Sequence, residues 1–139
     1  MSTVATDGES MAADRRVTGD GMVHCNTCKI ALAANGDIIG LAGSAFDLDA
    51  FVAWYNSDRI GELRIWEKSE ALVLQTDGRI MCYNEVGRCF EHEAPAALGS
   101  GAALAYGAMA AGCTPAQAVL IASERDIYSG GGVDVLVRP

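Results

Sequence analysis

Basic residues are scarce in this chain. Its 139 residues include 10 lysines and arginines against 18 aspartates and glutamates, so the formal net charge is −8. A protein that contacts phosphate groups needs clustered basic side chains. The composition therefore argues against nucleic acid or an anionic membrane surface as a partner.

Long apolar runs are missing as well. No stretch approaches the ~20 apolar residues of a membrane-spanning helix. The first residues also lack the basic segment and apolar stretch of a secretory signal peptide. We therefore expect a cytoplasmic protein. The five cysteines are odd in number, and we expect all of them to remain thiols in a reducing compartment. They are Cys25, Cys28, Cys82, Cys89 and Cys113.

What the chain does have is the balance of a globular protein, with half of its residues hydrophobic and 20% charged. The length suits one domain with a substantial core, which we assign to residues 1–139. No internal repeat or low-complexity linker divides this domain.

Short apolar segments bounded by turn residues predict a series of strands. Asp7-Gly8, Asn35-Gly36 and Asp77-Gly78 are hairpin turn signals. We expect the segments before and after the first two turns to form one meander, with a loop at 18–21. The predicted strands are 3–5, 10–13, 28–33, 38–42, 72–75, 79–83 and 133–137.

Three segments have helical patterns. In 44–56, apolar residues recur every three or four positions from Leu48 to Tyr55, and Ser44 with Asp47 resembles a capping box. A second helix, 99–112, is rich in Ala and Gly. A third begins at Thr114, whose Thr-Pro-Ala-Gln sequence suits a capped helix start, and runs to about 125. This order predicts an α+β fold with two antiparallel sheets facing each other, each covered outside by helices.

Ser2, directly behind Met1, is the first residue with chemical potential. If Met1 is removed, a hydroxyl and a free α-amine sit on one residue. An α-amine has a pKa of ~7.7–8.0, so part of it is neutral and accepts protons near neutral pH. A terminal hydroxyl residue activated by its own amine is a recurring solution to acyl transfer. Many proteins begin Met-Ser, so this feature gains its weight from the segments that follow.

Five segments, in order along the chain, carry a family resemblance. They are Ser2 to Ala5 with Ala12-Ala13-Asp14-Arg15-Arg16-Val17-Thr18, then Lys29-Ile30, Leu41-Ala42-Gly43-Ser44-Ala45, Gly99-Ser100-Gly101, and Asp126 to Gly131 followed by Val133-Asp134-Val135. Together they resemble the proteasome β-type subunits and the HslV-type bacterial peptidases. Those proteins are N-terminal nucleophile (Ntn) hydrolases with a four-layer αββα fold. The resemblance spans nearly the whole chain and implies a short member of bacterial or phage type.

The resemblance implies a reaction centre at the start of the chain. Ser2 would attack a peptide carbonyl in the place usually held by threonine. Lys29 would lower the pKa of the hydroxyl and favour loss of the proton of the α-amine. Asp14 would pair with Lys29 and hold its charge and orientation. Without the motifs, Asp14 and Lys29 would be interpreted as a simple ion pair, which contributes little at a surface.

Four further residues would support that centre. Ser100 and Ser129 would hydrogen-bond near the α-amine, and Asp126 would support their turn, although such residues also serve as helix caps and turn residues. Gly43 would lend its backbone N–H to an oxyanion hole, where a missing side chain lets substrate approach. A plain turn glycine is the alternative role for Gly43.

The resemblance also implies a substrate pocket. Thr18, Leu41 and Ala45 would line the site for the side chain that precedes the scissile bond. Leu41 with Ala45 suggests an apolar pocket of moderate size.

The chain departs from the family pattern in three ways. Ser2 lacks the methyl group with which threonine restricts χ1, so we expect a working but slower peptidase. No propeptide precedes Ser2, and Met1 alone would have to leave. The stretch between Asn56 and Leu72 is compact and no C-terminal extension follows, which affects partner docking more than the catalytic centre.

We therefore expect an N-terminal-serine endopeptidase of the threonine type. By resemblance, it would act on polypeptides inside a closed homo-oligomer of rings, without a metal or an organic cofactor. An ATP-dependent unfoldase is a further partner compatible with the family, although no docking motif identifies one.

Two other functions compete with this expectation. One is a catalytically inactive structural ring subunit, against which the joint retention of the motif residues argues. The other is a zinc module built from His24-Cys25-x-x-Cys28 with Cys89 and His92. It is disfavoured because Cys25 and Cys28 lie at the start of a predicted strand, where successive side chains alternate between faces, and no turn glycine is present.

Overall fold

The computed structural model describes residues 2–65 and 68–139, which form eleven strands and three helices. The strands are β1 (Val4–Thr6), β2 (Ser10–Asp14), β3 (Arg16–Gly19), β4 (Met22–Asn26), β5 (Ile30–Leu32), β6 (Ile38–Ala42), β7 (Glu70–Leu74), β8 (Ile80–Tyr83), β9 (Cys89–His92), β10 (Ala96–Leu98) and β11 (Val133–Val137). The helices are α1 (Asp47–Asn56), α2 (Ala102–Ala110) and α3 (Pro115–Arg125). Met1, and with it the expected removal of Met1, lies outside the described residues, as do positions 66 and 67 in the compact stretch before β7.

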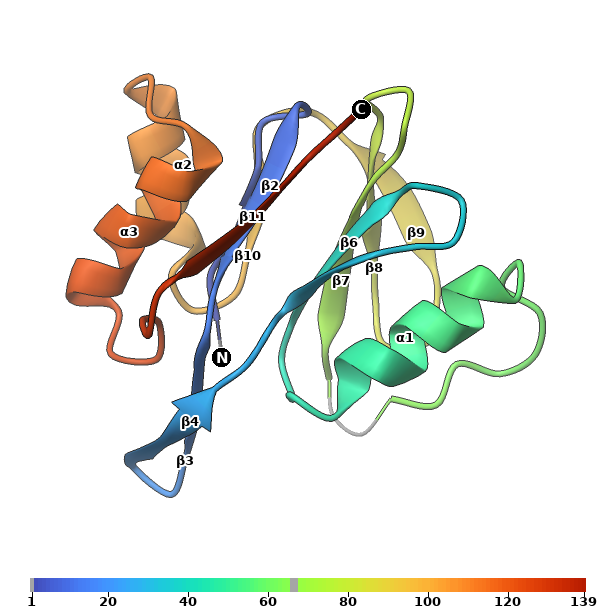
Figure 1. The fold of residues 1–139 in the computed structure, drawn as a ribbon, viewed down its shortest axis with the longest axis horizontal. Coiled ribbons are helices and arrows are strands. Elements are labelled where there is room, and N and C mark those ends of the chain that lie inside the picture. The colour runs from blue at the N-terminus through green and yellow to red at the C-terminus, as the bar shows by residue number, and fades with distance from the viewer. Residues whose placement is uncertain (1, 66–67) are drawn as a thin grey trace.

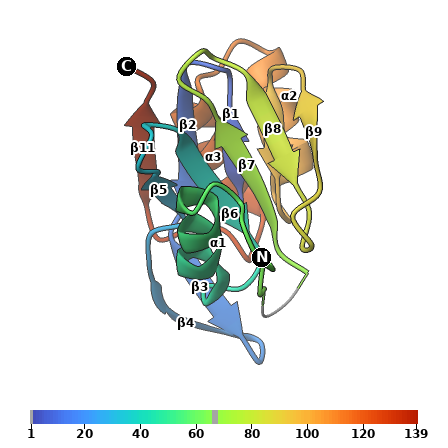
Figure 2. The same ribbon diagram turned by 90° about the vertical axis from the view of Figure 1, so that its right-hand side faces the viewer.

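Two antiparallel sheets face each other at the centre of the molecule (Figure 1). One has four strands in the order β10-β1-β2-β11, and the other has five in the order β5-β6-β7-β8-β9. Helices α2 and α3 cover the outside of the first sheet, and α1 covers the outside of the second (Figures 1 and 2). The predicted α+β sandwich with four layers, αββα, is confirmed.

Apolar side chains fill the space between each pair of layers. Met11 and Leu72 are fully buried in the cluster between the two sheets. Under α1, Phe51 and Tyr55 form part of an aromatic cluster. Under α2 and α3 the buried residues are mostly alanines, such as Ala105, and these small side chains bring the helices close to the sheet.

The helix ends follow their sequence signals to different degrees. The predicted capping box at the start of α3 is present: the Thr114 hydroxyl accepts from Gln117 N, and Gln117 Oε1 accepts from Thr114 N. The predicted box at Ser44 is absent. Helix α1 begins later, its N-cap is Phe46, and the Ser44 hydroxyl accepts from Phe46 N instead.

The expected meander of four strands is wrong. The β1–β2 and β5–β6 hairpins are present, but they belong to opposite sheets. Between them, the predicted loop at 18–21 forms the end of β3 and the turn of a separate hairpin, β3–β4, which projects beyond both sheets (Figure 1). This hairpin carries the chain from one sheet to the other, so that the strands flanking it meet across the core.

None of the helices in the described residues has the length and apolar character that crossing a bilayer requires.

Candidate active site

Asp14, at the end of β2, is the centre of a buried polar cluster. It is fully buried, and both of its carboxylate oxygens lie 2.9 Å from Lys29 Nζ. It also accepts backbone hydrogen bonds from Thr3 N, Arg16 N and Gly130 N at 3.0, 3.1 and 3.0 Å. A buried carboxylate needs this many donors, because burial of a charge is costly unless it is paired and hydrogen-bonded.

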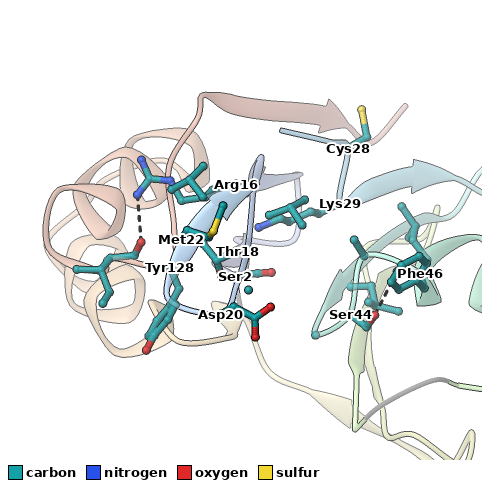
Figure 3. A pocket seen from close by; sticks show the side chains of 18 of the residues that line it. Ser2, Arg16, Thr18, Asp20, Met22, Cys28, Lys29, Ser44, Phe46 and Tyr128 are labelled. Atoms are coloured by element: carbon teal, nitrogen blue, oxygen red, sulfur yellow. Dashed lines mark hydrogen bonds between the residues drawn. The ribbon is translucent and has the colours of Figure 1, made fainter. Parts of the chain in front are cut away.

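Lys29 precedes β5 and is 7% exposed, with its side chain reaching toward Ser2 (Figure 3). Burial lowers the pKa of Lys29 and outweighs Asp14, which raises it, while the charge of Arg16 lowers it further. The buried pair of Lys29 and Asp14 thus differs from the surface ion pair that the sequence left open as an alternative. A buried lysine whose pKa is shifted by burial and by a specific charged partner, at the wall of a cleft, is typical of a functional site.

Ser2 and Thr3, at the start of the chain, contact residues that come much later in the sequence. Ser2 is 1% exposed and lines a cleft. Its carbonyl oxygen accepts from Gly101 N at 3.3 Å. A Cβ atom on Gly99 would stand 1.9 Å from that carbonyl oxygen, so only glycine allows the chain to pass this close to Ser2.

The turn at 126–129 binds to the first residues through a chain of hydroxyls. Ser129 and Ser100 each donate to Asp126 Oδ2 at 2.6 Å. Thr3 Oγ1 lies 2.7 Å from Ser129 Oγ, and because Ser129 donates its proton to the carboxylate, Thr3 is the donor in this pair. Burial raises the pKa of Asp126, but the hydrogen bonds from Ser100 and Ser129 lower it more, and the net pKa is below the usual value. The cluster therefore favours a charged Asp126.

A cleft of about 540 Å³ opens beside this cluster. It lies between the β3–β4 hairpin, the start of α1 and the 127–128 turn (Figure 3). Ser2, Lys29 and Gly43 line it together. The predicted nucleophile, lysine and oxyanion glycine therefore share one accessible space. Gly43 has φ +143°, a conformation that residues with side chains rarely adopt.

The three predicted substrate-binding residues also line this cleft. Thr18 comes from β3, Leu41 from β6 and Ala45 from the segment before α1. Leu48 and Phe46 extend the apolar part of the wall. The remaining predicted residues, Asp14, Ser100, Asp126 and Ser129, do not line the cleft. Asp14 contacts Lys29 and Thr3 N, Ser129 contacts the Thr3 hydroxyl, and Asp126 accepts from Ser100 and Ser129.

Two features near the site were not assigned from the sequence. Arg16 lines the cleft (Figure 3) and donates to Ile127 O at 3.1 Å. It also lies against Gly130, where an added Cβ atom would be 2.6 Å from the Arg16 guanidinium. It thereby ties β3 to the 126–130 turn. Asp47 and Ser69 form a buried pair behind Gly43. Neither role has a local signal in the sequence, because both depend on segments that are distant along the chain.

The zinc alternative finds no support among residues 2–65 and 68–139, where no three His, Cys, Asp or Glu side chains gather as a metal site would require. His92 instead contacts Tyr106 of α2 at 3.2 Å, and Cys28 accepts from Arg15.

The comparisons with known proteins give similarity of structure rather than of sequence. No protein-family model matches the chain, and no curated protein matches it. Among solved structures, HslV from Trypanosoma brucei is 24% identical, with a TM-score of 0.72 over 97% of this chain and 98% of that one. This chain has the HslV fold. BPH from Thiobacillus denitrificans is 19% identical, with a TM-score of 0.71 over 99% and 98% of the two chains. The structure of BPH in complex with epoxomicin is 18% identical, with a TM-score of 0.72 over the same shares. These matches show a fold shared over nearly the whole length of each chain.

Proposed function

We propose that this protein is a single-domain peptidase that hydrolyses polypeptides with Ser2 as its N-terminal nucleophile. The observation that carries the proposal is the buried Asp14–Lys29 pair beside Ser2, in a cleft of a chain with the HslV fold. Removal of Met1 would turn the backbone nitrogen of Ser2 into an α-amine. The hydroxyl and its general base would then belong to one residue.

The proposed reaction has two steps. In the first, Ser2 Oγ attacks the peptide carbonyl and passes its proton to the α-amine, while the carbonyl oxygen takes up negative charge. The amine returns the proton to the leaving nitrogen as the C–N bond breaks, which leaves an ester on Ser2. In the second, the amine takes a proton from water, whose oxygen attacks the ester. As the acid product leaves, the amine returns that proton to Ser2 Oγ, which restores the hydroxyl and the neutral amine.

The surrounding residues have complementary roles in this proposal. The positive charge of Lys29 stabilises the alkoxide form of Ser2 and opposes protonation of the α-amine. Asp14 holds Lys29 in place. The backbone N–H of Gly43 binds the oxyanion. Asp126, Ser129 and Ser100 fix the backbone of the first residues, so that the amine and hydroxyl keep their relative position.

Specificity and assembly are further parts of the proposal. Thr18, Leu41 and Ala45 would bind the side chain before the scissile bond, and the apolar wall favours an apolar one. The protein would act in the cytoplasm as a homo-oligomer of rings, and an ATP-dependent unfoldase would be compatible with it. Serine in place of threonine would make it slower than its threonine counterparts, because Ser2 samples more χ1 rotamers.

Covalent labelling tests this function. The intact mass of the purified protein first shows whether Met1 is present, and the protein is then incubated with epoxomicin. We expect one adduct on Ser2, absent in Ser2→Ala and in Lys29→Ala and retained in Ser57→Ala, a matched control on an exposed serine. A chain that keeps Met1 contradicts the proposal. A chain that lacks Met1 but does not label favours the inactive ring subunit instead.

A further inference from the structure

A buried pair of polar residues lies directly behind the Gly43–Ser44 segment. Asp47, the first residue of α1, is 1% exposed, and Ser69, just before β7, is 2% exposed. Ser69 Oγ donates to Asp47 Oδ2 at 2.7 Å and accepts from Ser44 N at 3.0 Å. A helix start and a strand start thus meet at the wall of the cleft.

The direction of these hydrogen bonds is fixed by chemistry. An ionised carboxylate only accepts, so the single proton of the Ser69 hydroxyl goes to Asp47. The lone pairs of Ser69 are then directed to the Ser44 N–H. Asp47 lies in the first turn of α1, where the helix dipole favours a negative charge. Asp47 therefore sets the orientation of Ser69, and Ser69 sets that of the peptide between Gly43 and Ser44.

Ser69 also packs directly against Gly43. A Cβ atom placed on Gly43 would stand 2.2 Å from Ser69 Oγ and 2.7 Å from Ser69 Cα. The backbone of Gly43 is therefore in contact with Ser69 and, at φ +143°, has a conformation that needs support from its surroundings. The contact on one side and the hydrogen bond to the next residue together supply that support.

We propose that Ser69, oriented by Asp47, is a positioning residue for the oxyanion hole. It holds the Gly43–Ser44 segment in the conformation in which the Gly43 N–H meets the developing negative charge. This inference rests on the proposed function. It means that Asp47 and Ser69, which do not touch the substrate, influence the transition state of peptide hydrolysis. Donors act on a transition state only if they are aligned in advance, so loss of this support weakens catalysis rather than substrate binding.

The test is Ser69→Ala in the full-length, assembled protein. Removal of one oxyanion donor lowers kcat by ~10²–10³-fold, and because Ser69 acts through Gly43, we expect a smaller loss of roughly 10- to 100-fold. KM for a fluorogenic peptide stays within about twofold. The inhibition constant of a peptide aldehyde, which forms a tetrahedral adduct on Ser2, rises by the same factor by which kcat/KM falls.

Thr6→Val is the matched control. Thr6 is equally buried, its hydroxyl accepts from Gly8 N and donates to Ser10 O, and it lies away from the cleft. The Thr6→Val variant loses a buried, hydrogen-bonded hydroxyl, as Ser69→Ala does, so we expect lower stability with unchanged kcat and aldehyde affinity. Ser69→Cys provides a second variant if Ser69→Ala does not fold, because it keeps the packing against Gly43 and weakens only the hydrogen bonds.

The outcomes separate the two proposals. A folded Ser69→Ala or Ser69→Cys protein with wild-type kcat overturns the positioning role, as does a loss of kcat without a matching loss of aldehyde affinity. An equal loss of kcat in Thr6→Val also overturns it. If the wild-type protein has no Ser2-dependent turnover, the proposed function fails, and this inference fails with it.

Discussion

Replacement of Asp14 by asparagine tests how the buried cluster is held together. Asp14 accepts from Lys29 and from three backbone N–H groups, with donors directed at both of its oxygens. Asparagine has nearly the same shape, but it carries no charge and has one NH2 group in place of an oxygen. In either orientation of the amide, that NH2 group faces a donor, and the buried Lys29 loses its counter-charge.

The expected loss of stability is large. Removal of one partner from a buried ion pair costs about 3–5 kcal/mol. The total free energy of unfolding of a protein is typically about 5–15 kcal/mol, so this loss is a substantial fraction of it. For a chain of this length it corresponds to a decrease in Tm of roughly 10–20 °C. Labelling of Ser2 should be lost as well, because Lys29 is no longer held beside it.

Urea unfolding of four proteins measures this effect: the wild type, Asp14→Asn, Lys29→Met and the double variant. We expect Lys29→Met to cost less than Asp14→Asn, because Asp14 keeps its three backbone donors. The double variant should be more stable than the sum of the single effects by roughly 0.5–3 kcal/mol, since it leaves no uncompensated lysine. Asp58→Asn is the control on an exposed aspartate and should change stability by less than about 0.5 kcal/mol. Additive single effects, or an Asp14→Asn protein as stable as the wild type, would refute the reasoning.

Three further predictions concern the pH dependence of stability, the proposed oxyanion role of Gly43 and the start of α3. Because the pKa of Lys29 is lowered from 10.5 in the folded state, the unfolded chain binds that proton more tightly. The stability of the wild type relative to Lys29→Met should therefore rise as the pH is raised toward 10.5, and a fall in urea titrations over that range would contradict it. Gly43→Ala would place Cβ 2.2 Å from Ser69 Oγ, so we expect at least ~100-fold slower labelling by epoxomicin, and labelling at the wild-type rate would count against an oxyanion role. Thr114→Ala removes the N-cap of α3, which should cost about 1 kcal/mol in thermal unfolding and leave turnover unchanged; an intact Tm would mean that the cap contributes nothing.

Local sequence patterns predicted the elements whose signals are themselves local. The capping box at Thr114 is complete within four residues, and the 3.6-residue period from Leu48 to Tyr55 marks the buried face of α1. Strand β9 was missed because most of Cys89–His92 is exposed at the edge of its sheet, so no alternation of apolar residues marks it. Strand β10 is short, and its alanines do not distinguish a strand from a helix.

The residues of the candidate site also divide into those that a sequence motif identifies and those that only the fold brings together. Family motifs identified Asp14, Lys29 and the 126–129 turn, and the structure brings these residues together around the first residues of the chain. The Asp47–Ser69 pair lies outside those motifs. Its members are 22 positions apart, and Ser69 lies beside Gly43 and Ser44 because β6 pairs with β7 in a register that sets Ala42 opposite Glu70. The pairing of two strands, and no local pattern, creates this contact.

The hydrogen bonds of Asp14 also determine the stage of translation at which the candidate site around Ser2 can form. This side chain gathers donors from residue 3 and from residue 130, and β11 then pairs with β2 along its length. Contacts this distant in sequence form only after most of the chain is available to fold. A partly synthesised chain therefore carries Ser2 without the 126–130 turn that completes the hydrogen bonds around it. In a peptidase, that order would keep each new molecule inert until its own translation is almost complete.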